Sequence, residues 1–210
     1  MSESTVFIVD DDPSIRKGLT RLLSVSGISV ETFNSACDFL AEWKCDRPGC
    51  ILLDVHMPDM TGPEMQRKLL HSDCFLPLIF LTAYGDAYTA TRAMKMGAVD
   101  FLEKPVNKDD LLEAIRIALE RDKELRKKRV DNYSLMKKIE KLTLREHEVM
   151  TYVITGSLNK QIADEMNISE ETVKIHRGRM MKKLEITSVA ELVWLCVQAG
   201  ITPSQSLNLG

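Results

Sequence analysis

The stretch Cys50-Ile51-Leu52-Leu53-Asp54 decides the fold. Four apolar residues in a row, followed by a carboxylate, are typical of a strand that is buried on both faces. Such strands occur in parallel sheets that helices cover on both sides. Short runs of the same kind recur on either side of this stretch, at residues 6–9, 29–33, 78–81 and 99–102. The first half of the chain therefore contains five predicted strands.

Helical patterns separate these strands. Asp12-Pro13 is a cap followed by the residue that suits a first helical position, and Gly27 fits the end of that helix. Further helices are predicted from Ser35, over 61–70, over 87–96 and from about 107–110 onward. Alternating strands and helices with right-handed crossovers leave few topologies. We expect an α/β doubly wound, five-stranded parallel sheet of the flavodoxin-like kind, as a domain over residues 4–120.

Polar residues stand where the predicted strands end. Asp10 and Asp11 follow the first strand, Asp54 the third, Thr82 the fourth and Lys104 the fifth. Because the carboxyl ends of parallel strands meet in one crevice, these distant residues should form a single site. Three carboxylates, a hydroxyl and an ammonium group suit a divalent cation and a phosphoryl group.

The predicted chemistry of this site is formation of an acyl phosphate. A carboxylate can attack phosphorus, and Asp54 is the expected nucleophile because it stands alone at the end of a buried strand. Both reactants are negative, so Mg²⁺ held by Asp10 and Asp11 would remove their repulsion. Lys104 and Thr82 would neutralise and hydrogen-bond the transferred group.

Composition places the chain among ordinary globular proteins. It has 210 residues, of which 44% are hydrophobic, and this length suits one large or two ordinary domains. No stretch approaches the roughly 18 apolar residues that span a bilayer, and the start of the chain does not resemble a secretory signal. The five cysteines show no metal-binding spacing, which favours reduced thiols and a cytoplasmic location.

The two halves of the chain differ in charge. Residues 1–120 hold 12 Lys and Arg against 19 Asp and Glu, whereas residues 121–210 hold 16 against 12. An acidic half joined to a mildly basic half indicates two tasks on one chain, and the basic half hints weakly at nucleic acid. Residues 121–141 are largely polar and predict a helical linker. Residues 142–205 show only helical patterns, which begin with the capping box Thr143-x-x-Glu146.

Within the basic half, two helices are joined by a tight turn. The first is predicted over 159–166, the turn lies at Asn167-Ile168, and Ser169 caps the second, over about 170–184. This spacing is typical of a helix-turn-helix, whose second helix lies in the major groove of DNA. We therefore expect a small all-α domain after the linker. On spacing alone, an ordinary amphipathic helix with a solvated, cationic side is the alternative to a DNA-binding helix.

The first half closely resembles the receiver domain of two-component response regulators. The resemblance rests on Val9–Asp12, Leu53–Gly62, Leu81–Ala83 and Phe101–Pro105. It implies that a sensor histidine kinase phosphorylates Asp54. It also implies a Mg²⁺ site, with Mn²⁺ as a possible substitute, formed by Asp10, Asp11, Asp54 and the main-chain carbonyl of His56. Thr82, Lys104 and Phe101 would bind the phosphoryl group or switch with it, and the Lys104–Pro105 peptide would often be cis.

Two further positions are implied to tune the lifetime of the phosphate. In receivers, the residues that correspond to His56 and Tyr84 flank the phosphoryl group. We hypothesise that this bulky pair restricts the access of water. The alternative is that both side chains are exposed and have no effect.

The second half closely resembles the LuxR-type DNA-binding domain, over 142–197. The resemblance implies DNA contacts by Lys160, Thr172, Val173, Lys174, Ile175, His176, Arg177 and Arg179. It implies a dimer contact on the last helix by Val189, Leu192, Val193 and Cys196. One departure is Gly178, which stands where relatives often carry a longer, base-reading side chain.

Together the halves resemble the FixJ-like branch of transcriptional response regulators. This implies a chain that is phosphorylated on Asp54, forms a homodimer and binds promoter DNA, with RNA polymerase as a further partner and no membrane contact. It is not expected to be an enzyme. A phosphatase of the haloacid-dehalogenase type would need a second Asp where His56 stands, and its nucleophile on the first strand. A receiver that serves only as an unphosphorylated dimerisation module is a second alternative.

Overall fold

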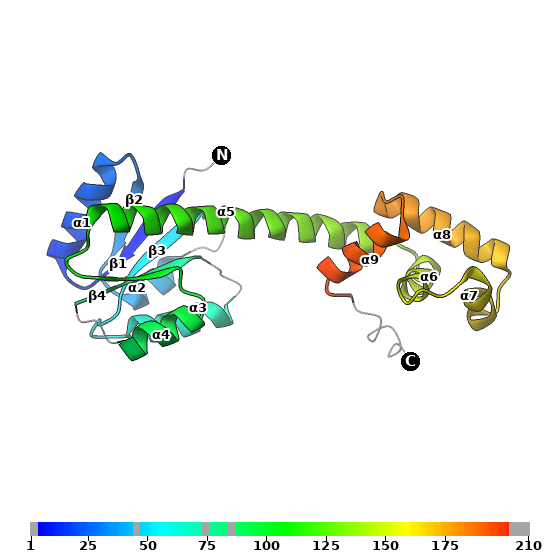
Figure 1. The fold of residues 1–210 in the computed structure, drawn as a ribbon, viewed down its shortest axis with the longest axis horizontal. Helices are drawn as coiled ribbons and strands as arrows, with labels where there is room; N and C mark the ends of the chain where they lie inside the picture. The colour runs from blue at the N-terminus through cyan, green and yellow to red at the C-terminus, as the bar shows by residue number, and fades with distance from the viewer. Residues whose placement is uncertain (1–3, 44–46, 73–75, 84–86, 202–210) are drawn as a thin grey trace. The chain divides into compact units, whose positions relative to one another are not determined.

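A computed structural model of the chain describes residues 4–43, 47–72, 76–83 and 87–201. The chain divides into two compact units, residues 1–126 and residues 127–210 (Figure 1). This boundary lies a few residues beyond the predicted end of the first domain at residue 120. Residues 202–205, at the end of the predicted second domain, lie outside the described residues.

The first unit is the expected five-stranded parallel sheet, in the order β2-β1-β3-β4-β5. Every neighbouring pair is parallel. Its strands are β1 (Thr5–Val9), β2 (Ser29–Phe33), β3 (Gly49–Asp54), β4 (Leu78–Thr82) and β5 (Asp100–Glu103). Its helices are α1 (Pro13–Val25), α2 (Ala36–Glu42), α3 (Gly62–His71), α4 (Ala87–Lys95) and α5 (Lys108–Ile139), the last of which runs into the second unit.

Each face of the sheet has its own hydrophobic core, because neighbouring residues of a strand point to opposite sides. On β3, Ile51 and Leu53 pack with α2, α3 and α4, whereas Cys50 and Leu52 pack with α1 and α5. All four side chains are fully buried. This explains why the third strand is a continuous apolar run: neither of its faces meets water. The sheet therefore holds the end of β3 rigidly in place.

Near the end of the first unit, hydrogen bonds hold α5 against the edge of the sheet at which the strands begin. The buried carboxylate of Asp122 accepts a hydrogen bond of 2.9 Å from the backbone N–H of Gly49. Arg126 Nε donates to the same carboxylate at 2.8 Å, and its guanidinium also donates to the carbonyl of Arg47. Residues 122 and 126, which the sequence placed in a linker, thus take part in the packing of the first unit.

We expect Asp122→Ala to destabilise the first unit by about 2–4 kcal/mol, because a buried N–H and a guanidinium lose their acceptor. Urea unfolding followed by the fluorescence of Trp43 in a Trp194→Phe background measures this. Glu113→Gln is the matched control, since Glu113 forms an exposed pair with Arg116 on the same helix and should change stability little. Equal effects of the two variants would contradict a special role for Asp122.

The second unit is all-helical, as predicted. After the end of α5 it contains α6 (Leu144–Ile154), α7 (Asn159–Met166), α8 (Glu170–Leu184) and α9 (Val189–Gln198). Its core joins side chains from all these helices, among them Val149, Ile162, Val173, Leu184 and Leu192. Ile139, the last residue of α5, is buried in the same core. The first part of α5 thus belongs to the core of the first unit, and its last residue belongs to the core of the second.

The predicted capping box at the start of α6 is present and extends to α8. Thr143 Oγ1 accepts from the backbone N–H of Glu146, and the Glu146 carboxylate accepts from that of Thr143. Lys183 Nζ donates to the same carboxylate at 2.5 Å. Burial alone would raise the pKa of Glu146, but the hydrogen bonds from Lys183 and Thr143 outweigh it and hold that pKa below its ordinary value.

A depressed pKa makes the contribution of Glu146 to stability depend on pH. It is complete above the ordinary glutamate pKa and is lost as pH falls through the lower pKa of the folded state. We expect Glu146→Gln to cost about 1–3 kcal/mol at neutral pH, and this difference from the parent to shrink in acid. Urea unfolding followed by Trp194 fluorescence in a Trp43→Phe background checks this. Glu148→Gln, which breaks an exposed pair with Arg145, should have little effect at any pH.

The described cysteines form no disulfide bonds. Cys37 is exposed and free, and Cys50 and Cys196 are buried and free. Within the described ranges, no helix combines the length and the apolar character that crossing a bilayer requires.

Candidate functional site

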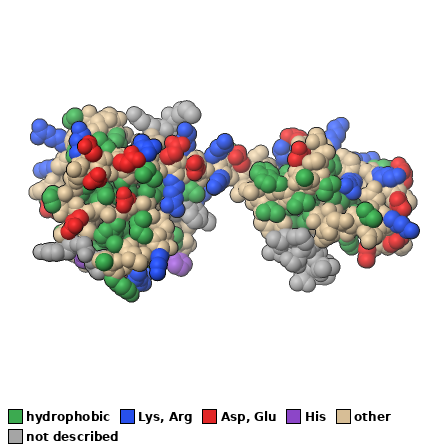
Figure 2. Space-filling model, in the orientation of Figure 1, with side chains coloured by type: hydrophobic (Ala, Val, Ile, Leu, Met, Phe, Trp, Pro, Cys, Tyr) green, Lys and Arg blue, Asp and Glu red, His purple; other side chains and the backbone are tan. Residues whose placement is uncertain are grey.

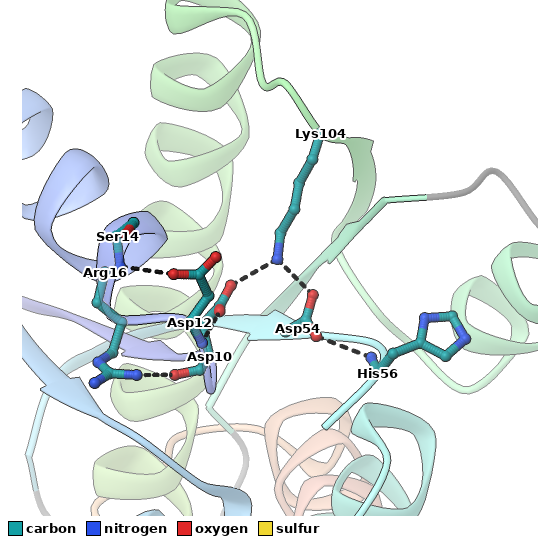
Figure 3. A network of polar contacts seen from close by, with 7 residues as sticks. All are labelled: Asp10, Asp12, Ser14, Arg16, Asp54, His56 and Lys104. Atoms are coloured by element: carbon teal, nitrogen blue, oxygen red, sulfur yellow. Dashed lines mark hydrogen bonds and ion pairs between the residues drawn. The ribbon is translucent and has the colours of Figure 1, made fainter. Parts of the chain in front are cut away.

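The candidate site lies where the strands end (Figure 3). β1 and β3 are neighbours in register, with Val9 opposite Leu53, so Asp10 and Asp54 reach the same level at the edge of the sheet. Thr82 ends β4, and Lys104 directly follows β5. The backbone N–H of Lys104 donates to the carbonyl of Thr82 at 2.7 Å, which ties the fifth strand end to the fourth. The sheet order thus brings together residues over ninety positions apart.

The ammonium group of Lys104 joins the two buried carboxylates. Its Nζ lies 2.6 Å from Asp10 Oδ2 and 2.6 Å from Asp54 Oδ1 (Figure 3). Asp10 and Asp54 are buried, and the Lys104 side chain is largely so. Because a buried carboxylate is costly without a partner, this bridge holds both side chains in a defined position. The Lys104–Pro105 peptide is cis, as the resemblance implied.

Backbone amides hold the second oxygen of each carboxylate. The N–H of Asp12 donates to Asp10 Oδ1 at 2.9 Å, and the N–H of His56 donates to Asp54 Oδ2 at 3.0 Å. Arg16 adds a hydrogen bond to the main-chain carbonyl of Asp10 at 2.6 Å. Each oxygen of both carboxylates therefore accepts at least one hydrogen bond, so the rotamers of Asp10 and Asp54 are fixed.

The charges at this site are not balanced. Burial raises the pKa of Asp10, although hydrogen bonds from Lys104 and from the backbone of Asp12 act in the opposite direction. Burial would lower the pKa of Lys104, but its hydrogen bonds to Asp10 and Asp54 outweigh this and leave that pKa raised. Lys104 thus stays an ammonium ion, one positive charge beside two carboxylates. Such a site favours a further cation.

The other predicted site residues lie around this pair. Thr82 is buried, and Phe101 is partly buried with its ring centroid 5.9 Å from that of Phe80. Asp11 and the side chain of His56 are exposed. Tyr84 lies outside the described residues, so the hypothesis about the His56–Tyr84 pair stays a prediction.

The structure does not bring all the predicted metal ligands into one group. Among the residues that the structure describes, no three Asp, Glu, His or Cys side chains form a group placed to hold a metal ion. Asp11 is exposed, and Lys104 bridges Asp10 and Asp54. Two carboxylates nevertheless fit Mg²⁺, which usually binds one or two carboxylates and keeps several waters. The unbalanced negative charge of Asp10 and Asp54 also favours binding of a cation.

A second candidate surface lies on α7 and α8. Asn167 ends α7 in the left-handed conformation (φ 53°), which allows the tight turn, and the Ser169 hydroxyl accepts from the backbone N–H of Thr172 at the start of α8. Arg177 Nη1 donates to Asn159 Oδ1 at 2.9 Å and fixes α8 against the start of α7. This is the predicted helix-turn-helix geometry.

The predicted DNA-contacting residues differ in how far their side chains are exposed. Lys160, Lys174, Ile175 and Arg179 are exposed, whereas Thr172, His176 and Arg177 are partly buried. Val173 is fully buried in the core of the unit, so its prediction as a DNA contact is wrong. The reason is helical spacing: Val173, Met180 and Leu184 lie on the inward face of α8.

The predicted dimer contact on α9 needs a similar correction. Leu192 and Cys196 are buried in the unit's own core and are not available to a second chain. The hydrophobic residues that α9 exposes are Val189, Val193, Trp194 and Val197. Figure 2 shows hydrophobic side chains gathered over α9 and the end of α5. Of the four predicted residues, Val189 and Val193 are exposed, whereas Leu192 and Cys196 lie on the inward face of α9.

Two family descriptions match this chain. "Response regulator receiver domain" matches residues 6–116, and "Bacterial regulatory proteins, luxR family" matches residues 140–196. The chain belongs to the response regulators. Its receiver domain carries Asp10, Asp54 and Lys104, and its LuxR-type domain carries the helix-turn-helix.

Relatives of this response regulator share both domains along most of their length. Nodulation protein W of Bradyrhizobium diazoefficiens is 40% identical over 205 residues, which cover 98% of this chain and 90% of that protein. The transcriptional regulatory protein FixJ of Rhizobium meliloti is 37% identical over 204 residues, which cover 97% and 100%. The second of these names describes a transcriptional regulator, in agreement with the prediction that the response regulator is not an enzyme.

Solved structures of response regulators share the fold. That of StyR is 43% identical, covers 94% of this chain and all of that one, and has a TM-score of 0.78. Full-length FixJ from B. japonicum is 34% identical over 96% of this chain and all of that one, with a TM-score of 0.58. The prediction of a FixJ-like response regulator is confirmed.

Sequence reasoning missed two contacts and one exposed side chain of this response regulator. It did not find Arg16 at the carbonyl of Asp10, Asn159 at Arg177, or the exposed Trp194. A helical wheel of α9 would have found Trp194, because Leu192, Leu195 and Cys196 mark the inward face. No local sequence signal indicates the partners of Arg16 or Arg177.

Proposed function

We propose that a sensor histidine kinase phosphorylates Asp54, and that the phosphorylated chain forms a homodimer and binds promoter DNA through α7 and α8. The observation that carries this proposal is the position of Lys104 Nζ, 2.6 Å from both Asp10 and Asp54. An ammonium ion fixed beside a buried carboxylate neutralises charge where a phosphoryl group would arrive.

The phosphoryl transfer follows from these positions. An Asp54 carboxylate oxygen attacks the phosphorus of a phosphohistidine, and the phosphorus–nitrogen bond breaks with its electron pair left on the imidazole nitrogen. Lys104 balances charge on the incoming phosphoryl group, and the hydroxyl of Thr82 donates to one of its oxygens. The backbone N–H of His56 holds the carboxylate in place during the attack.

Mg²⁺, or Mn²⁺ in its place, fits the carboxylates of this site. Asp10, Asp11, Asp54 and the main-chain carbonyl of His56 would hold it. When bound, the cation supplies the positive charge that lets a negative phosphodonor approach a carboxylate. Without that charge, Asp10 and Asp54 repel the donor, and Lys104 alone offsets only one of them.

Phosphorylation adds negative charge and strong acceptor oxygens beside Thr82 and Lys104. Thr82 moves toward the phosphoryl group, and Phe101 turns inward from its present contact with Phe80. The receiver is thus a two-state element that the phosphate biases, and dimerised chains place two DNA-binding units on two half-sites. RNA polymerase is a further proposed partner, and the cytoplasm, where a kinase and DNA are both accessible, is the proposed location.

The exposed cations of the helix-turn-helix support DNA as the ligand. Lys160, Lys174 and Arg179 are exposed on α7 and α8, and Ile175 is 46% exposed between them. Cations of this kind contact phosphates, whereas residues on the outward face of α8 reach base edges in the major groove. On α9 the exposed Val189, Val193, Trp194 and Val197 form the proposed contact between DNA-binding units.

The test is selection of duplexes from random DNA by the full-length chain, with and without acetyl phosphate and Mg²⁺. We expect a sequence with two half-sites, spaced by about one helical turn or a multiple, to be enriched only with the phosphodonor. Its affinity should fall steeply as salt rises. Enrichment of the same sequence without phosphodonor would support the dimerisation module instead, and no enrichment in either case would refute DNA binding.

A further inference from the structure

Gly178 lies on the outward face of α8. The inward face is marked by the buried side chains of Val173, Met180 and Leu184. Gly178 follows Lys174 by four residues and Ile175 by three, so it lies one turn further along the same exposed face. Lys182 follows by another four residues and is also exposed. Gly178 therefore leaves a gap in the middle of the exposed face of α8. Under the proposed function, this face lies against DNA.

The fold itself does not require a glycine at this position. Gly178 has no positive φ, and an added Cβ would meet no atom within 4 Å. The contrast is Gly49, where an added Cβ would lie 1.9 Å from the backbone oxygen of Thr5. Glycine in the interior of an exposed helix lowers stability relative to alanine. The sequence thus keeps a destabilising residue where packing would accept a larger one.

The gap at Gly178 suits an apolar group. It has no side-chain donor or acceptor, and backbone groups inside an α-helix are already hydrogen-bonded to one another. Ile175, an apolar side chain that is 46% exposed, lies one helical turn before it on the same face. In the major groove, the methyl group at C5 of thymine is the apolar feature of the base edges.

We propose that Gly178 and Ile175 form a notch that receives the 5-methyl group of a thymine in each half-site. This inference rests on the proposed function, because it needs α8 in the major groove. The exposed ammonium groups of Lys174 and Lys182 lie on either side of the notch along the helix and draw that face toward the DNA. Gly178 is then a specificity-determining residue that acts by the absence of a side chain.

The experiment uses the duplex that the full-length chain selects in the presence of acetyl phosphate and Mg²⁺. Each thymine is replaced in turn by deoxyuridine, which lacks only the methyl group. At one thymine per half-site, we expect this loss to weaken binding about fourfold, the effect of one buried methyl group. Gly178→Ala should weaken binding to the thymine duplex at least about fivefold, because two methyl groups would compete for one space.

The decisive measurement is the coupling between the two changes. On the deoxyuridine duplex the loss caused by Gly178→Ala should shrink, since the alanine methyl then occupies the vacated space. Gly18→Ala is the matched control: Gly18 is also an exposed helical glycine with nothing within 4 Å of an added Cβ, but it lies on α1. Both variants should unfold at a higher temperature, and only Gly178→Ala should change DNA binding.

Two results would overturn the notch, and they are distinguishable. If the parent chain selects a sequence but Gly178→Ala binds it equally well, or shows the same loss on every deoxyuridine duplex, the notch does not exist while DNA binding stands. If the parent chain selects no sequence at all, the proposed function fails and the notch fails with it.

Discussion

Replacing Asp54 with asparagine is expected to abolish the mass gain of one phosphoryl group that the parent chain shows with acetyl phosphate and Mg²⁺. The amide is not a nucleophile toward phosphorus at neutral pH. It is close in size to the carboxylate, and its single oxygen can accept a hydrogen bond either from Lys104 or from the N–H of His56, which bind separate oxygens of Asp54. We expect the fold to persist with one of these two hydrogen bonds lost. Intact-protein mass spectrometry measures the gain, and circular dichroism checks the fold.

Two controls sharpen this result. Asp59→Asn changes an exposed carboxyl five residues further along the chain and should keep the full mass gain. Removal of divalent cations by EDTA should abolish the gain in the parent chain, because Lys104 alone does not balance Asp10 and Asp54. A gain that persists in Asp54→Asn would place the phosphate elsewhere. Its absence in the parent as well would favour a receiver that acts only as a dimerisation module.

Gly62→Ala is expected to destabilise the first unit by about 2–3 kcal/mol and to slow phosphorylation of Asp54. Gly62 is the first residue of α3 and is buried against the end of β3. An added Cβ would lie 2.5 Å from the backbone oxygen of Asp54 and 2.8 Å from the ring of Phe80. Since the backbone cannot yield cheaply, α3 or the end of β3 must shift, and the nucleophile shifts with it.

Urea unfolding followed by Trp43 fluorescence in a Trp194→Phe background measures the stability of this variant. Mass spectrometry over time measures the rate of phosphorylation. Gly18→Ala is again the control with the opposite sign, because an exposed helical glycine with open space gains up to about 1 kcal/mol from alanine. An unchanged stability and rate in Gly62→Ala would show that the tight contact with Asp54 does not exist in solution.

Much of the receiver could be predicted from sequence because its signals are local. The strand at 50–54 is a continuous apolar run up to its last residue, Asp54, which is polar because it lies at the functional edge of the sheet. The rule that parallel strands end at one edge then assembled Asp10, Asp54, Thr82 and Lys104 without coordinates. The resemblance to known domains supplied the roles of these residues.

What could not be predicted depends on contacts between distant residues or on which side of a helix faces inward. The Lys104 ammonium group proved to bridge two carboxylates, and Asp11 proved to be exposed, which no spacing reveals. Motif resemblance assigned Val173 to DNA and Leu192 to a dimer contact, yet both are core residues. A motif match identifies residues that matter, and it does not separate those that support a helix from those that touch the ligand.

The burial of Ile139 determines which C-terminal fragments of the chain can stay folded. A protease that cleaves after Arg126 would leave the second unit with Ile139 in its core and with Leu135 and Leu142 packed around it. Cleavage after Lys141, at the border that sequence motifs suggest, would remove Ile139 and Leu135 and open part of this core to water. The shorter fragment should therefore aggregate or unfold, although every residue of its DNA-binding motif is intact.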